Sequence, residues 1–97
     1  MWAISWLPGQ ATGFHDHGDS AGAFAVVFGA LQEERPSRPA HTVGAGEVCT
    51  FAAGAVHNVR NTSTAPAISI HAYSPPLAIM NRRTRQGNDT WGFVRTA

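Results

Sequence analysis

Glycine and proline interrupt this chain so often that they exclude long helices. The 97 residues include 10 glycines and 6 prolines, and before the final residues no interval between them carries apolar residues at sustained helical spacing. The intervals instead hold short runs rich in β-branched, aromatic and small apolar residues, which are typical of strands. Many short strands separated by turns at this spacing predict an all-β sandwich or small barrel.

Six segments are predicted as strands, and they form a single domain spanning residues 1–97. These segments are 2–7, 12–17, 23–29, 47–52, 56–60 and 67–73. Residues 29–34 continue the third strand into a hairpin, and 35–39 are predicted as a loop because proline cannot donate to a strand ladder. The pattern weakens after Pro76, so residues 81–97 are expected to be a peripheral tail.

The strand pattern also divides side chains between the core and the surface. We expect Trp2, Trp6 and Phe24 in the core. Glu33 and Glu34 are expected on a solvated face, and His41 in an exposed loop.

Composition indicates which partners are unexpected and in which cellular compartment the protein is expected. Hydrophobic residues make up 43% of the chain, charged residues 13%, and the formal net charge is +1. Because no basic stripe is present, neither nucleic acid nor an anionic membrane is expected as a partner. The chain shows no signal peptide and no apolar run of transmembrane length. Its one cysteine, Cys49, excludes an intrachain disulfide, so we expect a cytoplasmic protein.

Three histidines form the candidate metal site. His15 and His17 are two residues apart, and alternate residues of a strand point to the same face. His57, on a neighbouring strand, would complete a three-nitrogen set that leaves metal positions open for chemistry. A lone histidine is more often an ordinary surface or core residue, but the joint spacing of these three favours metal binding.

The histidines lie within two motifs that resemble those of the cupin superfamily. The first motif places Gly9 before His15-x-His17 and Gly29 after it; the second contains Gly46, Gly54, His57 and Asn61. Two positions depart from the pattern. Gly22 stands where most cupins have a metal-binding glutamate, and Ala52 stands where they have a proline. The resemblance implies a cupin-type jelly-roll sandwich or barrel with a metal site of three neutral imidazoles.

A second stretch resembles the thiol dioxygenase branch of that superfamily, typified by cysteine dioxygenase. Residues 69–76 read Ser-Ile-His-Ala-Tyr-Ser-Pro-Pro, similar to the family's Ser-x-His-x-Tyr-Ser-Pro-Pro signature. The resemblance implies Fe(II) held by the three histidines, with Tyr73 beside the substrate or O₂. His71 would orient Tyr73, and Ser69 would orient His71. Alternate positions share one strand face, which suits such a relay. The alternative is that His71 and Tyr73 are ordinary buried strand residues.

Two features of that family are missing from this sequence. Gly22 occupies the position of the cysteine that animal enzymes crosslink to the catalytic tyrosine. No arginine precedes Trp6, whereas cysteine dioxygenases hold the substrate carboxylate with an arginine from an N-terminal segment. The related 3-mercaptopropionate dioxygenases use an arginine after the Ser-Pro-Pro, a part that Arg82 or Arg83 could take here. Loss of the N-terminal layer would expose apolar surface and favour self-association.

Four hypotheses follow from these observations. The leading one is a mononuclear non-haem Fe(II) enzyme that oxidises L-cysteine to cysteine sulfinate with O₂. The second keeps this chemistry but takes 3-mercaptopropionate or another small thiol. The third is a truncated cupin that binds metal without activity. The fourth is a zinc hydrolase, since three histidines also suit Zn(II), although the Ser-His-Tyr strand has no evident role in it.

Overall fold

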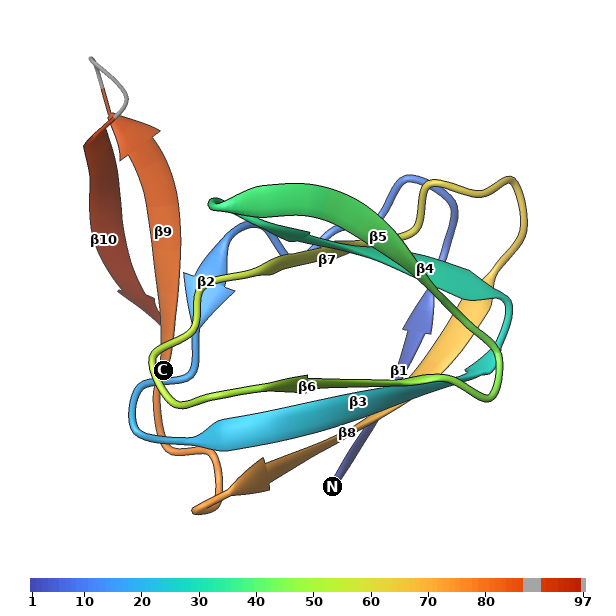
Figure 1. Ribbon diagram of the computed structural model, residues 1–97, viewed down its shortest axis with the longest axis horizontal. Coiled ribbons are helices and arrows are strands. Elements are labelled where there is room, and N and C mark those ends of the chain that lie inside the picture. The colour runs from blue at the N-terminus through green and yellow to red at the C-terminus, as the bar shows by residue number, and fades with distance from the viewer. Residues whose placement is uncertain (87–89, 97) are drawn as a thin grey trace.

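The described residues form β-strands, as the sequence predicts, and the strands pair antiparallel (Figure 1). The structure, a computed structural model, describes the backbone of residues 1–86 and 90–96 and the side chains of residues 1–82. Over these backbone ranges it contains ten strands and no helix. The strands are β1 (Trp2–Trp6), β2 (His15–Asp16), β3 (Ala21–Phe28), β4 (Ala30–Arg35), β5 (Arg38–Gly44), β6 (Val48–Phe51), β7 (Asn58–Arg60), β8 (Ala67–Ser74), β9 (Met80–Gln86) and β10 (Thr90–Thr96).

The strands form two facing layers. One is a four-stranded sheet in the order β1-β8-β3-β6, and the other contains β5-β4-β7. Isolated bridges between Ala11 and Arg60 and between His15 and His57 connect β7 to the segment that ends in β2. That segment then pairs with β9. Figure 1 shows the layers stacked, with the β9–β10 hairpin projecting at one end.

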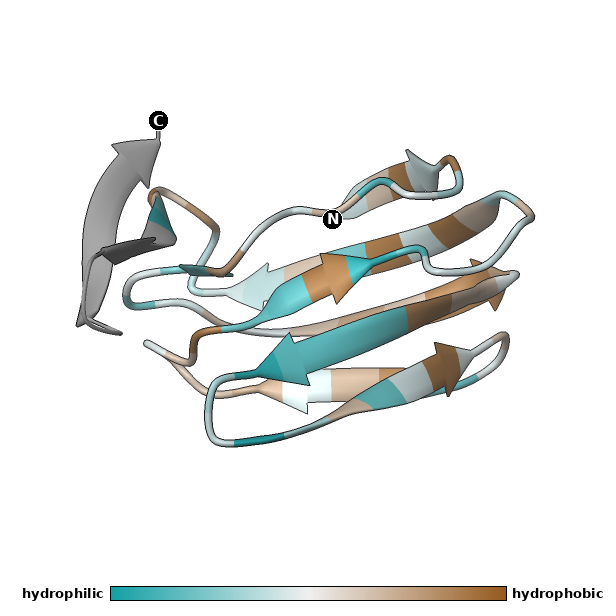
Figure 2. Cartoon of the chain, turned by 90° about the horizontal axis from the view of Figure 1, so that it is seen from above, coloured by the Kyte–Doolittle hydropathy of each residue, from teal (hydrophilic) through white to brown (hydrophobic). Residues whose placement is uncertain are grey.

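Alternation along the strands places one face of each sheet in the core. Figure 2 shows apolar and polar bands alternating along several strands. On β8, Ala67, Ser69 and His71 are buried, whereas Ile68, between the first two, and Ala72, after His71, are exposed. The buried apolar core consists of Trp6, Phe24, Val26, Leu31, Val43, Cys49, Phe51, Val59 and Ala67.

Two expectations about the core and surface are wrong. Trp2 is 56% exposed, in contrast to Trp6 and Phe24, which are buried as predicted. Trp2 is exposed because it begins β1, which lies at the edge of its sheet. Glu33 is fully buried rather than solvated, because it shares the inward face of β4 with Leu31, two residues before it.

The prolines of residues 35–39 do not produce the predicted loop. The turn is confined to residues 36–37, and Arg35 already pairs with Arg38 across the hairpin. Pro39 is tolerated in β5 because this strand lies at the edge of its sheet, where proline is accommodated. His41 is exposed as expected, but it lies on β5 rather than in a loop.

The C-terminal segment has more regular structure than the sequence pattern indicates. The backbone of β9 pairs along its whole length with that of β10. It also pairs with β2 through the partners His15 with Arg82 and Asp16 with Asn81. Asn81 Nδ2 donates to Asp16 Oδ1 at 3.0 Å, which ties the start of the hairpin to the segment that carries the two histidines.

Candidate metal centre

The three predicted ligands are brought together by the pairing of two short segments. His15 and His57 face each other across an antiparallel bridge, and each backbone N–H donates to the other's carbonyl at 2.9 Å. His17 follows one residue after β2. All three histidines are buried, with 2–3% of their surface exposed. One ring nitrogen from each lies within 4.8 Å of those of the other two.

The inward nitrogens fit a common metal ion. His15 Nε2 and His17 Nε2 are 3.2 Å apart. Nitrogens bound to one metal ion at about 2.1 Å lie roughly 3.0–3.4 Å apart at octahedral or tetrahedral angles. His15 Nδ1 lies 2.8 Å from the Gly13 carbonyl; because a carbonyl only accepts, Nδ1 carries the proton and Nε2 keeps its lone pair. The residues therefore fit a divalent metal.

A buried carboxylate fixes the third imidazole. Glu33 Oε2 accepts from His57 Nδ1 at 2.8 Å, so the lone pair of His57 is on Nε2. Burial raises the pKa of Glu33, but hydrogen bonds from His57 and Arg35 outweigh it and lower this pKa to about 2. Glu33 is therefore a carboxylate at neutral pH, paired with His57 and Arg35.

Burial also keeps the imidazoles of His15 and His17 neutral. Desolvation lowers the pKa of His15 to about 4, despite its hydrogen bond to Gly13. Desolvation, reinforced by the neighbouring histidines, lowers that of His17 to about 3. Neutral imidazole is the form that binds a metal ion, so both side chains are ready to bind at physiological pH.

Phe51 occupies the space that a carboxylate or thiol at position 22 would need. A Cβ built on Gly22 would lie 2.5 Å from the Phe51 ring. This ring stacks on His17, with centroids 4.8 Å apart, and also packs against His57 at 4.7 Å. Gly22 therefore allows an aromatic ring, rather than a fourth protein ligand, to cover the histidines.

A hydrogen-bonded chain runs along the inner face of β8. Trp6 Nε1 donates to Ser69 Oγ at 2.8 Å, and Ser69 Oγ lies 2.7 Å from His71 Nε2. Because indole only donates, the serine hydroxyl is free to donate its own proton to His71. Burial lowers the pKa of His71 to about 4. In the part of the chain whose side chains are described, no hydrogen bond joins His71 to Tyr73, so only the Ser69–His71 link of the expected relay is formed.

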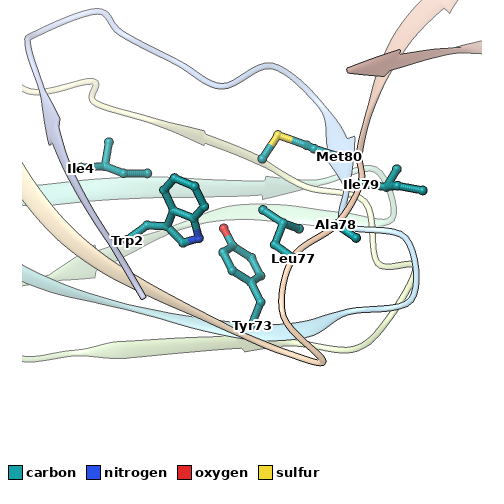
Figure 3. A pocket seen from close by; sticks show the side chains of 7 residues that line it. All are labelled: Trp2, Ile4, Tyr73, Leu77, Ala78, Ile79 and Met80. Carbon is teal, nitrogen blue, oxygen red and sulfur yellow. The ribbon is translucent and has the colours of Figure 1, made fainter. Parts of the chain in front are cut away.

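Tyr73 contacts His17 and also lines an apolar cavity. Its ring lies against His17, with centroids 4.9 Å apart. A cavity of about 300 Å³ lies between β1 and residues 77–80, and Figure 3 shows the phenol oxygen of Tyr73 near Trp2 and Leu77. The cavity is lined by Trp2, Ile4, Tyr73, Leu77, Ala78, Ile79 and Met80. Burial raises the pKa of Tyr73, so its phenol is protonated at neutral pH.

Arg82 lies beside the histidines in the strand register. It is the partner of His15 across the β2–β9 pair, and directly opposed residues place their side chains on one face of a sheet. Arg82 is exposed, so it lies at the rim of the cluster rather than within it. The side chain of Arg83, the other arginine considered, lies outside the described residues.

Glu33, His41 and Cys49 form a second group that does not suit a metal. Their candidate ligand atoms lie within 4.8 Å of one another. However, Arg35 donates to both oxygens of Glu33, at 3.0 and 3.2 Å, which places a cation where a metal would be. Burial and the nearby Glu33 raise the pKa of Cys49 to about 11, so this side chain is a thiol, whereas a metal binds the thiolate.

Comparison with protein families identifies the chain. A sequence model of the family described as cysteine dioxygenase type I matches residues 1–86. The chain belongs to this family. The matched range contains the three histidines, the Ser-His-Tyr strand and Arg82. The metal of this cysteine dioxygenase family member would be held by the three buried imidazoles.

Solved structures confirm the cupin-type fold. The TT1209 protein of Thermus thermophilus is 28% identical, with a TM-score of 0.70 over 76% of this chain and 70% of that one. A Klebsiella pneumoniae protein with a double-stranded β-helix domain is 19% identical, with a TM-score of 0.70 over 97% and 72%. A Cupin 2 conserved barrel domain protein from Salinispora arenicola is 18% identical, with a TM-score of 0.64 over 73% and 58%.

Two side chains at the centre of this family member were missed by the sequence analysis. Glu33 follows Leu31 by two residues, so period-two alternation on one apolar strand was a signal that it faces inward. Phe51 has no local signal for its position over the histidines, because its contacts come from segments distant in sequence.

The structure also contains no helix, among the residues it describes, that could span a membrane.

Proposed function

We propose that this chain is a mononuclear non-haem Fe(II) thiol dioxygenase that oxidises L-cysteine to cysteine sulfinate. The observation that carries the proposal is the set of three buried, convergent imidazoles with glycine at position 22, in a member of the cysteine dioxygenase family. Imidazole ligands suit Fe(II), and without a carboxylate ligand the full charge of the ion is available to an anionic thiolate.

The proposed reaction needs no further reductant. A thiol and O₂ combine to give a sulfinic acid, R–SH + O₂ → R–SO₂H, in which sulfur loses four electrons and both oxygen atoms are bound to it. A bound ferrous ion supplies the open coordination positions and the redox chemistry that this conversion requires.

The surrounding side chains would position the substrate and exclude water. Tyr73, which contacts His17 and lines the apolar cavity, presents a protonated phenol that can donate to a substrate or to oxygen. Ser69 would orient the neutral His71 ring through the hydrogen bond between Ser69 Oγ and His71 Nε2. We assign the substrate carboxylate to Arg82, because its position opposite His15 places a cation at the rim of the histidine cluster.

A comparison of two histidine variants tests the proposal. Protein loaded anaerobically with Fe(II) is mixed with L-cysteine in aerated buffer, and oxygen uptake and sulfinate are measured together. We expect both in the wild type and in His41→Ala, which removes an exposed imidazole, and neither in His17→Ala. Iron binding without sulfinate from any small thiol would instead support an inactive metal-binding cupin, and metal-dependent hydrolysis would support the zinc alternative.

A different thiol is the second candidate, and Arg82 is the observation that favours it. An arginine after the Ser-Pro-Pro is the carboxylate partner that the resemblance to 3-mercaptopropionate dioxygenases implies. Turnover of 3-mercaptopropionate measured beside L-cysteine under the same conditions decides between the two substrates. For either substrate we propose a cytoplasmic enzyme, supported by the single cysteine and its buried, protonated thiol.

A further inference from the structure

The buried carboxylate of Glu33 meets the metal centre through His57. We infer that Glu33 is a positioning residue of the metal site, which holds the His57 imidazole in its binding tautomer and strengthens its nitrogen donor. The inference rests on the proposed three-histidine metal site but not on thiol oxidation.

The contact is geometrically well defined. Glu33 is on β4 and His57 immediately precedes β7, the strand that pairs with β4. Glu33 Oε2 lies 2.8 Å from His57 Nδ1, and both side chains are almost completely excluded from solvent. A short hydrogen bond to a carboxylate fixes the ring orientation, commits the proton to Nδ1 and makes the opposite nitrogen a better donor.

The three imidazoles differ in the hydrogen-bond partner of their Nδ1 atoms. His15 Nδ1 donates to a neutral carbonyl, that of Gly13, at 2.8 Å. His17 Nδ1 is buried and has no hydrogen-bond partner among the described residues. His57 is therefore the ligand of the three with an anionic partner. The chain has no carboxylate at position 22 that could bind the metal. The Glu33 carboxylate instead contacts the centre indirectly, through its hydrogen bond to His57 Nδ1.

Two hydrogen bonds from Arg35 hold Glu33 in place. Arg35 donates to Oε1 from Nε at 3.0 Å and to Oε2 from Nη2 at 3.2 Å. Arg38 and His41 lie farther from Oε1, at 3.7 and 3.6 Å. A buried ion pair adds little stability relative to well-packed apolar side chains, so fold stability alone does not account for a carboxylate in this position.

Metal affinity measures the proposed role directly. Glu33→Gln keeps the size of the side chain and removes its charge, and Glu34→Gln is the matched control, since Glu34 is the next residue of β4 and partly exposed. Competition with a chromophoric chelator gives the Co(II) dissociation constant of each protein. We expect a roughly 10–100-fold weaker affinity in Glu33→Gln and a value within about twofold of the wild type in the control.

Nuclear magnetic resonance of the Zn(II)-loaded proteins separates positioning from general loosening. The Nδ1 protons of His57 and His15 report on the carboxylate and on the Gly13 carbonyl in one spectrum. Positioning by Glu33 predicts that Glu33→Gln shifts the His57 proton and speeds its exchange, while the His15 proton is unchanged. Unaltered Co(II) affinity, an equal loss in Glu34→Gln, or equal disturbance of both protons would overturn the inference.

A double variant keeps the test decisive if Glu33→Gln does not fold. Glu33→Gln with Arg35→Gln removes both members of the ion pair and leaves no unpaired buried charge. The inference predicts weakened Co(II) affinity in this folded protein as well, and wild-type affinity would contradict it. None of these measurements includes a thiol, so the result stands whether or not the chain oxidises one.

Discussion

Gly22 is the residue at which this metal centre departs most from a four-ligand cupin site. The missing carboxylate was identified from the sequence, but its structural reason was not. The Phe51 ring fills the space above Gly22 and stacks on His17. These contacts join segments that are far apart in the chain, so no local pattern could have predicted them.

Substitution of Gly22 tests this packing. Gly22→Ala places a methyl group against the Phe51 ring and is expected to destabilise the protein by about 1–3 kcal/mol, as overpacking of a core typically does. Chemical denaturation measures the loss. Equal stability of the variant and the wild type would show that Phe51 moves freely and does not define the site.

Arg82 is the residue proposed to bind the substrate carboxylate, and its substitution tests this role. Arg82→Gln should raise the KM of the thiol substrate by about tenfold or more, with a smaller effect on kcat. The reason is that a hydrogen bond to a charged group contributes about 1.5–3 kcal/mol to binding. Steady-state oxygen uptake measures both constants. Arg60→Gln, which breaks a surface ion pair with Glu34, is the control and should leave both unchanged. A loss in kcat with unchanged KM would remove Arg82 from substrate binding.

Strand β8 carries both core and site residues on one face. The sequence predicted this strand and the shared face of residues 69, 71 and 73 correctly, because alternation and a double proline mark it clearly. It did not predict β5, because prolines suggested a loop and the edge position that tolerates Pro39 is a property of the whole sheet. The short pairing of β2 with β9 was not predicted either, because β2 is only two residues long and shows no periodic pattern.

Removal of the Ser69 hydroxyl tests the chain of hydrogen bonds on β8. Ser69→Ala leaves the Trp6 N–H and the His71 Nε2 without this partner in the core. We expect a loss of about 1–3 kcal/mol in the free energy of unfolding, measured by urea denaturation. Ser63→Ala, in an exposed turn, is the comparison. A Ser69→Ala protein as stable as the wild type would mean that this chain does not hold His71.

For the whole molecule, the buried imidazoles make the stability of the metal-free protein dependent on pH. Burial lowers the pKa values of His15, His17 and His71 to about 4, 3 and 4. Between their ordinary value of 6.5 and pH 4, the unfolded chain takes up protons that the folded chain does not, so stability falls as the pH falls. Each imidazole contributes up to about 1.4 kcal/mol per pH unit. Urea midpoints from pH 7.5 to 4.5 measure the effect, and a flat profile would contradict it.

We propose that the outer face of the four-stranded sheet is where the self-association expected from the sequence takes place. Ala3, Ile70, Ala25 and Val48 form one row across its four strands. The face also contains exposed Ile68 and Phe28, which are register partners. No charged side chain of the described strands β1, β8, β3 and β6 lies on it, so two copies could meet there without charge repulsion.

A charge placed on this face tests whether a second copy covers it. We expect the wild type to self-associate as its concentration rises, and Ile68→Glu to shift it to a monomer. Light scattering after gel filtration measures the mass. Thr42→Glu, on an exposed position of β5, should leave association unchanged. A wild type that is monomeric at all concentrations would refute the self-association.

We propose that three histidines equip this chain to transfer both atoms of O₂ to the sulfur of a small thiol. Mass spectrometry of the product formed from L-cysteine by Fe(II)-loaded protein under ¹⁸O₂ tests this proposal. We expect cysteine sulfinate in which both sulfinate oxygens are ¹⁸O. Absence of sulfinate, or sulfinate with oxygen derived from water, would contradict it.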